Sequence, residues 1–199
     1  MRNAPLQITS LNVDRQVDNE ELVSRILDDD TWAVEVFYQR FVHKITGIVA
    51  KLLRCRADVE DAVQETFIQA FRDMNQLREP KHVERWLVRI AVHRAHHRFR
   101  RRALKRRLGL DRSLDDESLT VQATDTTPPD VRAELALLDR AFDNMKMVER
   151  STFVLRYFEG YRLEEVADAT GASLATVKRR ITRAKEVIDR HTKEAVRDV

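Results

Sequence analysis

The sequence has a single cysteine, Cys55, among its 199 residues, and it has no long apolar run. One cysteine cannot form an internal disulfide, which excludes a disulfide-stapled secreted domain. A membrane-spanning helix needs roughly 18 or more apolar residues in succession, and no stretch approaches that length. No secretory signal precedes the first charged segment. We therefore expect a cytoplasmic protein.

Glycine and proline are also scarce, at four residues each, and no sustained alternation of apolar and polar residues appears. Sheet-based folds usually show glycine- and proline-rich turns between strands, and strands in which apolar and polar residues alternate. The hydrophobic content of 43% is nevertheless sufficient for small helical cores. We therefore expect an all-α protein of two small helical domains, with no catalytic residues, no cofactor and no metal.

Helical periodicity and composition divide the chain into four parts. Residues 1–18 lack periodicity and are expected to form an N-terminal tail, and residues 19–107 are expected to form a first helical domain. Residues 108–130 predict an acidic flexible linker, and residues 131–195 predict a second domain. Helices are expected over residues 20–27, 32–53, 59–74, 81–102, 131–145, 148–158, 163–170 and 174–191.

Caps and apolar spacing support these helices. Asp30 or Thr31 can cap the second helix, and Asp130 can cap the first helix of the second domain. Apolar residues at helical spacing predict one compact core in the first domain. The expected core residues are Val34, Phe37, Phe41, Ile45 and Ile48 of the second helix and Ala62, Val63, Phe67, Ala70, Phe71 and Met74 of the third.

The stretch over residues 163–188 has the pattern of a helix-turn-helix. We expect a short first helix that buries Val166 and Ala167, ends at Gly171 and is followed by Ser173 as the N-cap of the next helix. On a helical wheel the second helix has one narrow apolar stripe. That stripe consists of Val177, Ile181, Ala184 and Ile188.

The opposite face of this second helix is polar and cationic. Its middle suits contacts with base edges, and its rims, with Lys178 and Arg180, suit phosphates. The first helix, by contrast, carries acids and no cation. An ordinary surface helix with a solvated cationic face is the alternative, but the preceding helix and glycine turn favour DNA binding. The residues expected to contact duplex DNA are Ala175, Thr176, Lys178, Arg179, Arg180, Thr182 and Arg183.

A second cationic segment lies at the end of the first domain, although the formal net charge of the whole chain is only +3. Residues 94–107 contain eight cations, a density that indicates phosphate binding. The preceding loop, residues 75–82, together with Trp86 and Phe99, suits an unstacked base as well as a duplex. The alternatives are that Trp86 belongs to the core and that the arginines are simply solvated. A separate cationic stripe is expected from Arg85, Arg89, His96 and Arg100.

Two other chemical interpretations are weaker. His93 and His97 have the spacing of zinc ligands on one helix face, but no Cys or acidic residue stands at ligand spacing and the surroundings are cationic. A carboxylate cluster at the start of the third helix is favoured by the helix dipole without any catalysis. Acid–base catalysis would also need a cleft and a partner, so a protein-docking surface is favoured. The cluster consists of Asp58, Glu60, Asp61 and Glu65.

Three segments of the chain, in this order, resemble bacterial RNA polymerase sigma factors of the extracytoplasmic function group of the sigma-70 family. The segments are DVEDAVQETFIQAF (58–71), WLVRIAVHRAHHRFRRR (86–102) and FVLRYFEGYRLEEVADATGASLATVKRRITRAK (153–185). The resemblance extends over nearly all of residues 19–191. It implies a dissociable, non-enzymatic subunit that gives core RNA polymerase its promoter specificity.

The resemblance also implies partners for each segment. Asp61, Gln64 and Glu65 would dock onto the clamp helices of the polymerase's largest subunit, and the flap of the polymerase is a further expected contact. The linker would pass through the polymerase interior, and an anti-sigma factor is expected as a further partner. The second domain would read the minus 35 element as duplex. The melted minus 10 element would be read by Asn75, Arg85, Trp86, Arg89, His93, Arg94, His96, His97, Arg100 and Arg101.

Some positions depart from the usual pattern of the family. His93 stands where Asn is usual, which bears on the minus 10 preference. The sequence MKMVER over residues 145–150 replaces a more usual Leu-Pro-x-x-x-Arg, which predicts a less defined helix start. Thr170 and Ala172 stand where larger aliphatics are common, which predicts looser packing beneath the turn.

Two rival functions remain open from the residues alone. The first is a conventional helix-turn-helix regulator that binds duplex operators without polymerase, usually as a dimer. The second is a decoy that binds anti-sigma factors and never starts transcription. The decoy would not need the cations of residues 94–107, which argues against it.

Overall fold

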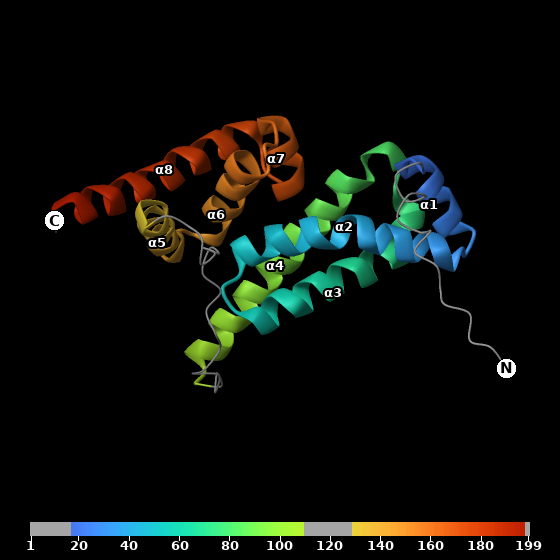
Figure 1. Ribbon diagram of the computed structural model, residues 1–199, viewed down its shortest axis with the longest axis horizontal. Coiled ribbons are helices and arrows are strands. Elements are labelled where there is room, and N and C mark those ends of the chain that lie inside the picture. The colour runs from blue at the N-terminus through green and yellow to red at the C-terminus, as the bar shows by residue number, and fades with distance from the viewer. Residues whose placement is uncertain (1–16, 110–128, 198–199) are drawn as a thin grey trace.

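The computed structural model describes residues 17–109 and 129–197 (Figure 1). Every regular element within these ranges is helical, as the sequence predicted. The tail expected over residues 1–18 and the linker expected over residues 108–130 fall almost entirely outside the described residues. None of the described helices combines the length and the apolar character that crossing a bilayer requires.

The first half of the molecule contains four α-helices and two short 3-10 turns. Asp18 and Asp30 cap the first two helices, accepting hydrogen bonds from the amides of Glu21 at 2.8 Å and Trp32 at 3.0 Å. The cap predicted at Asp30 is therefore confirmed. The elements are α1 (Asn19–Leu27), α2 (Thr31–Leu52), α3 (Arg56–Asp73), η2 (Met74–Gln76), η3 (Pro80–His82) and α4 (Val83–Arg107).

Helices α2, α3 and α4 lie side by side and bury a common core (Figure 1). Phe37 of α2 is fully buried and makes edge contacts with Phe41, Phe67 and Phe71, with ring centroids 4.8–6.4 Å apart. Most of the predicted core residues are buried, and Val34 and Phe71 pack against them while partly exposed. The sequence did not point to Thr66, which is buried and donates its hydroxyl to the carbonyl of Ala62 at 2.6 Å.

The second half begins two residues earlier than expected, at Pro129, so that Asp130 lies inside its first helix and the prediction of Asp130 as its cap is wrong. Gly171 ends the first helix of the helix-turn-helix in a left-handed conformation, with φ of 59°. Ser173 Oγ accepts a hydrogen bond from the amide of Thr176 at 3.2 Å, which confirms the predicted cap. The elements are α5 (Pro129–Asp143), α6 (Met147–Phe153), η4 (Val154–Phe158), α7 (Leu163–Thr170) and α8 (Leu174–Arg197).

Details of the second half differ from the sequence prediction. The α-helix expected over residues 148–158 ends at Phe153 and continues as the π-helical turn η4, and α8 runs beyond His191 to Arg197. The start of α6 is well defined, because Glu149 Oε2 accepts a hydrogen bond from the amide of Lys146 at 3.3 Å. In α7 the prediction of Val166 as a core residue is confirmed. Ala167 packs against the core while partly exposed, and Ala169, which the sequence did not select, is buried. In α8, Val177 and Ala184 are buried, while Ile181 and Ile188 are partly exposed.

The two halves are packed against each other, and their buried apolar residues form one continuous cluster. Helix α4 contacts α6 and α7, and the loop after α2 contacts the second half (Figure 1). Arg150 of α6 is buried and donates Nε to the Lys51 carbonyl at 2.7 Å, and desolvation lowers its pKa to about 10. Arg54 lies 3.3 Å from Asp139 and 3.1 Å from Asp143. These polar contacts join the end of α2 and the loop after it to α5 and α6.

Candidate nucleic-acid interface

The polar face of α8 is open to solvent along most of its length. Thr176 Oγ1 accepts a hydrogen bond from Arg179 Nη2 at 3.3 Å, which directs that side chain along the helix surface. Arg183 is 57% exposed, and its Nη1 lies 4.0 Å from Glu149 Oε1. The face therefore presents cations and small polar groups to solvent. Its exposed members are Ala175, Lys178, Arg179, Thr182 and Arg183.

Arg180 does not share this exposure. Its Nη1 atom is buried without a hydrogen-bond partner, and desolvation lowers the pKa of the guanidinium. Its charge acts on the His96 ring, which lies on α4 in the other half of the molecule. The sequence placed Lys178 and Arg180 on two equivalent rims, whereas the structure leaves Lys178 exposed and partly buries Arg180.

Helix α4 has one cationic face turned towards α3. Arginines spaced four residues apart on α4 meet the carboxylates at the start of α3, as successive turns of two adjacent helices allow. Arg98 is the central member, and only 16% of its side chain is exposed. From the sequence, the α3 carboxylates were expected to contact polymerase and the α4 arginines to contact DNA. In the structure the two clusters pair with each other. The pairs are Arg94–Glu65 at 3.9 Å, Arg98–Asp61 at 2.6 Å, Arg98–Glu65 and Arg102–Asp58 at 2.8 Å.

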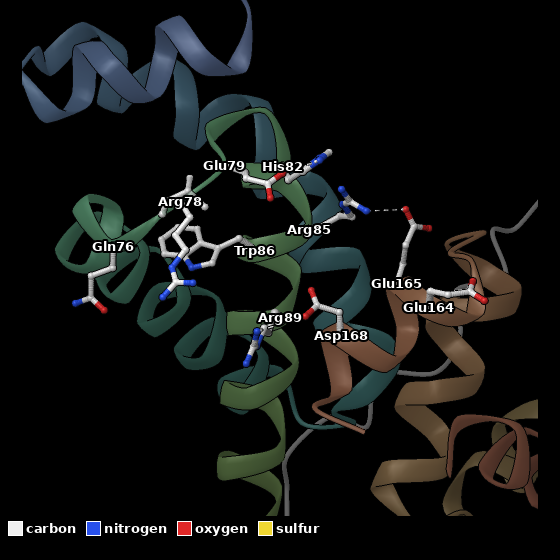
Figure 2. A pocket seen from close by; sticks show the side chains of 11 residues that line it. Gln76, Arg78, Glu79, His82, Arg85, Trp86, Arg89, Glu164, Glu165 and Asp168 are labelled. Atoms are coloured by element: carbon white, nitrogen blue, oxygen red, sulfur yellow. Dashed lines mark hydrogen bonds and ion pairs between the residues drawn. The ribbon is translucent and has the colours of Figure 1, made fainter. Parts of the chain in front are cut away.

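A second face of α4 is turned towards α7. Arg85 Nη1 lies 3.2 Å from Glu165 Oε1, and Arg89 Nη1 lies 3.5 Å from Asp168 Oδ1 (Figure 2). These two pairs bridge the two halves of the molecule. Neither α3 nor α7 contacts every cation, since Arg100, Arg101 and Arg106 lie exposed farther along α4.

A cleft of about 660 Å³ lies between the η2–η3 loop, the start of α4 and α7 (Figure 2). Trp86 lines the cleft and also packs against the core, so the two interpretations of this side chain are compatible. Arg78 and His82 line the same cleft, although the sequence selected only Asn75 from this loop. Arg78 and His82 could have been selected from the sequence, because a guanidinium and an imidazole close to an aromatic residue are typical of a site for an unstacked base.

The histidines of α4 have different surroundings. His96 is partly buried, its Nε2 lies 3.1 Å from Ser151 Oγ, and burial lowers its pKa to about 4. Burial, together with Arg89 and Arg100, also lowers the pKa of His93. His97 is exposed. Across the described ranges, no group of three or more His, Cys, Asp or Glu side chains has the arrangement of a metal site.

The surface expected to dock on polymerase is partly occupied by internal contacts. Asp61 and Glu65 both pair with Arg98, but the Asp61 side chain remains 51% exposed, and Gln64 is exposed. An apolar groove of about 420 Å³ between α2 and α3 borders Gln64. Tyr38 and Ile68 line this groove and are 40% and 58% exposed. The sequence analysis did not select them, although exposed large apolar side chains mark interaction surfaces.

Two family models match the chain. Sigma-70 region 2 matches residues 37–105, which extend from α2 to near the end of α4, and Sigma-70, region 4 matches residues 135–188, which include the helix-turn-helix. The two regions follow each other in the order that the three sequence segments predicted. The class of protein is therefore a sigma factor, which directs promoter-specific transcription initiation.

Relatives and solved structures agree with this class. The chain is 30% identical over 182 residues to the ECF RNA polymerase sigma-E factor of Haemophilus influenzae, covering 87% of this chain and 95% of the relative. It is 27% identical over 190 residues to the RNA polymerase sigma-H factor of Pseudomonas aeruginosa, covering 92% and 98%. The chain belongs to the extracytoplasmic function group of the sigma-70 family.

Two solved structures share the fold at 19% identity. One is the sigma factor RpoE in complex with the anti-sigma factor NepR from Bartonella quintana, with a TM-score of 0.62 over 79% of this chain and 96% of that chain. The other is CnrH in complex with the cytosolic domain of CnrY, with a TM-score of 0.63 over 88% of this chain and 97% of that chain.

Proposed function

We propose that this sigma factor makes its contacts in the initiation complex through three separate surfaces. The α3 surface docks on the clamp helices of the polymerase's largest subunit, and the second half contacts the flap. The η2–η3 loop and α4 read the melted minus 10 element, and α8 reads the minus 35 element as duplex. The chain acts in the cytoplasm as a non-enzymatic subunit. The proposed functional units are residues 19–107 and 131–195, joined by the acidic linker over residues 108–130.

The observation that carries this proposal is the presence of two unlike cationic surfaces on one chain. The α8 surface is exposed and rich in side chains of the kinds that contact base edges or phosphates. The α4 surface borders a cleft that contains an aromatic ring. An exposed cationic helix suits the major groove of a duplex, whereas a cleft with an aromatic ring suits a single strand.

Within α8, exposure and position select the residues that read sequence. Arg179 and Arg183 occupy the middle of the exposed face and are proposed to contact base edges. Lys178, also exposed, is proposed to contact phosphates. Arg180 is proposed to contact DNA only after its Nη1 atom, which is buried near α4, is released.

Within the first half, the cleft around Trp86 is the proposed site for an unstacked base of the minus 10 element. Arg78 and His82 extend this site beyond the residues selected from sequence. The exposed arginines Arg100 and Arg101 are proposed to follow the strand backbone. Arg94 is proposed to act mainly through its contacts with α3, because its Nε donates to Gln69 Oε1 at 2.9 Å.

For polymerase docking, the proposed surface combines Asp61, Gln64 and Glu65 with the apolar groove beside them. Exposed Ile68 and Tyr38 supply apolar area next to the polar residues, as protein interfaces require. An anti-sigma factor is a further proposed partner. The two solved structures of similar fold, each a complex whose partner is named above, support this last proposal.

A reconstitution experiment tests the proposal. Purified protein is added to core RNA polymerase on a promoter whose minus 10 and minus 35 elements it matches, and the transcripts are measured. We expect specific transcripts from the wild type, changed promoter preference from Arg179→Ala and weak open-complex formation from Trp86→Ala. A folded protein that binds duplex operators tightly without polymerase, and gives no transcripts with it, would support the rival regulator instead.

A further inference from the structure

A second cavity, of about 390 Å³, lies near the carboxyl end of α4. It is lined by the loop after α2, the start of α3, the last turns of α4, and the segment from α5 to α6, which lies beside the carboxyl end of α2 (Figure 1). Its volume falls within the range of roughly 300 to 1,000 Å³ that is typical of small-molecule sites. None of the residues proposed above to contact DNA or the clamp helices lines it.

The cavity has more positive than negative groups in its lining. Four arginines and two aspartates line it. Each aspartate is paired with one arginine, since Asp58 lies 2.8 Å from Arg102 and Asp143 lies 3.1 Å from Arg54. Within residues 17–109 and 129–197, the other two arginines form no ion pair with any carboxylate. The cavity is therefore cationic.

Arg150 of α6 is the more buried of these two arginines, with only 5% of its surface exposed. Its Nε donates to the Lys51 carbonyl at 2.7 Å, and its guanidinium lies over the Phe142 ring at 4.9 Å. Desolvation and repulsion by Arg54 lower its pKa to about 10, and the carboxylates that pair with Arg54 offset this only in part. A buried guanidinium without an ion partner destabilises a folded chain, and an anion in the cavity would relieve this.

The end of α4 supplies the second of these arginines and an aromatic ring. Arg106 is exposed there, and Phe99 is 38% exposed and lines the same cavity. The sequence grouped Phe99 with Trp86 as a platform for an unstacked base, but the structure places the two rings in different cavities. Phe99 is therefore an accessible aromatic surface that the proposed minus 10 site does not use.

The remaining walls are apolar. Methionine side chains adapt to differently shaped groups, and an aromatic ring favours another flat ring against its face. Guanidinium groups bind oxyanions through paired hydrogen bonds. A phosphate group carries up to two negative charges, so one such group can neutralise both unpaired arginines. The buried apolar residues of the lining are Leu52, Leu53, Phe142, Met145 and Met147.

We propose that this cavity binds a small phosphorylated molecule that carries an aromatic group, the chemical class to which nucleotides belong. The phosphate contacts Arg106 and Arg150, and the aromatic group packs on Phe99 and the methionines. The bound molecule joins the end of α4 to α6, and it stabilises the folded chain increasingly as its concentration rises. No residue assigned to the minus 10 element lines the cavity, so this site is separate from the proposed function.

Isothermal titration calorimetry of the free, full-length chain measures binding of adenosine diphosphate, phenyl phosphate, inorganic phosphate and adenosine. We expect adenosine diphosphate to bind at least about tenfold more tightly than inorganic phosphate or adenosine, because only it fills both parts of the cavity. Phenyl phosphate distinguishes two sources of the ligand. Binding as tight as that of the diphosphate would assign the site to phosphorylated aromatic molecules in general, and weaker binding would assign it to nucleotides. Equal affinities for adenosine diphosphate and inorganic phosphate would overturn the proposal.

Two neighbouring arginines of α4 provide a matched pair of variants. Arg106→Gln removes a charge from the cavity, and Arg107→Gln removes the same charge from the next exposed residue, which does not line it. We expect Arg106→Gln to weaken binding of adenosine diphosphate about tenfold, and Arg107→Gln to weaken it less than about twofold. Equal losses would indicate attraction to the net charge alone and would overturn the proposal. Because Arg106 is exposed, its replacement should leave the fold intact, which circular dichroism checks.

The aromatic contact has its own pair of variants. Phe99→Ala should weaken binding of adenosine diphosphate about fivefold or more, because a stacking surface is lost, and should leave binding of inorganic phosphate unchanged. Leu104→Ala removes a 57% exposed apolar side chain of α4 that does not line the cavity, and should change neither affinity. Equal losses of both affinities in Phe99→Ala would contradict the proposed contact.

The single cysteine locates the bound molecule. Cys55 lines the cavity, is buried and forms no disulfide. At a concentration about ten times its Kd, adenosine diphosphate should slow the reaction of this thiol with methyl methanethiosulfonate about tenfold, because only the unoccupied cavity admits the reagent. An unchanged rate at that concentration would place the molecule elsewhere on the chain and would overturn the proposal.

Discussion

The two cation-rich helices, α4 and α8, differ in what their charges contact. On α4, Arg94, Arg98 and Arg102 pair with α3, and Arg85 and Arg89 pair with α7. On α8 most of the cationic face is exposed. The number of arginines in a segment therefore does not show how many of them are free to contact DNA. The sparser helix presents the freer surface, because the acids Glu165 and Asp168 of α7 pair with α4 and not with α8.

The largest expected effect concerns the coverage of α4 by the second half. His96 lies against Ser151 of α6, and its burial, together with the charges of His93, Arg100 and Arg180, lowers its pKa to about 4. Because the folded chain binds this proton less tightly than the unfolded chain, protonation favours unfolding. Stability should therefore fall by roughly 2 to 3 kcal/mol as pH drops from about 6.5 to about 4.

Urea denaturation at a series of pH values measures this dependence, with His96→Gln as the variant and His97→Gln as the exposed control. The variant should have a flatter profile over this range, and the control should follow the wild type. Parallel profiles for all three proteins would show that α4 is not covered at His96.

The next effect concerns sequence reading by α8. Arg179→Ala should cost about 1 to 3 kcal/mol of discrimination at one base position of the minus 35 element, because a guanidinium that contacts a base edge is lost. Competition binding by holoenzyme on promoters with single-base changes measures this. Since Arg179 is exposed, the stability of the chain should not change. A uniform loss on every sequence would assign Arg179 to phosphate instead.

A smaller effect distinguishes paired from exposed cations on α4. Arg98→Ala should lower the free energy of unfolding by about 1 to 2 kcal/mol, because it leaves Asp61 and Glu65 without their shared partner. Arg101→Ala, an exposed neighbour, should leave stability within about 0.5 kcal/mol and weaken DNA binding. The opposite pattern, with Arg98 important for DNA and Arg101 for stability, would reverse the assignment of the two residues.

The smallest effect concerns the rim of α8. Lys178→Ala should weaken binding to all duplex promoters by a similar factor and reduce the magnitude of the salt-dependence slope by about 1, since one phosphate contact is lost. Titrations at several salt concentrations provide the measurement. A change confined to one sequence would mean that Lys178 contacts a base.

Local features of the fold were predictable because their causes are local. Gly171 and Ser173 mark the turn between α7 and α8, and Asp30 marks the start of α2. Most residues of the predicted apolar stripes lie in the core for the same reason. The family resemblance identified the function because it rests on three segments whose residues and order can be read directly from the sequence.

Contacts between distant segments were not predictable from one sequence. A helical wheel shows that Arg98 and Arg85 lie on different faces of α4, but it does not show that α3 covers one face and α7 the other. The same limit explains why Ala169 is more deeply buried than Ala167, and why Arg180 is partly buried while Lys178 is exposed. The packing of the two halves decides each of these outcomes.

Sequencing the transcripts that reconstituted holoenzyme initiates on genomic DNA tests the central claim most directly. The account predicts start sites preceded by shared minus 10 and minus 35 elements at a fixed spacing. It further predicts that Arg179→Ala alters only the minus 35 element. Transcripts without a shared upstream pattern, or a minus 35 element that Arg179→Ala leaves unchanged, would contradict the account.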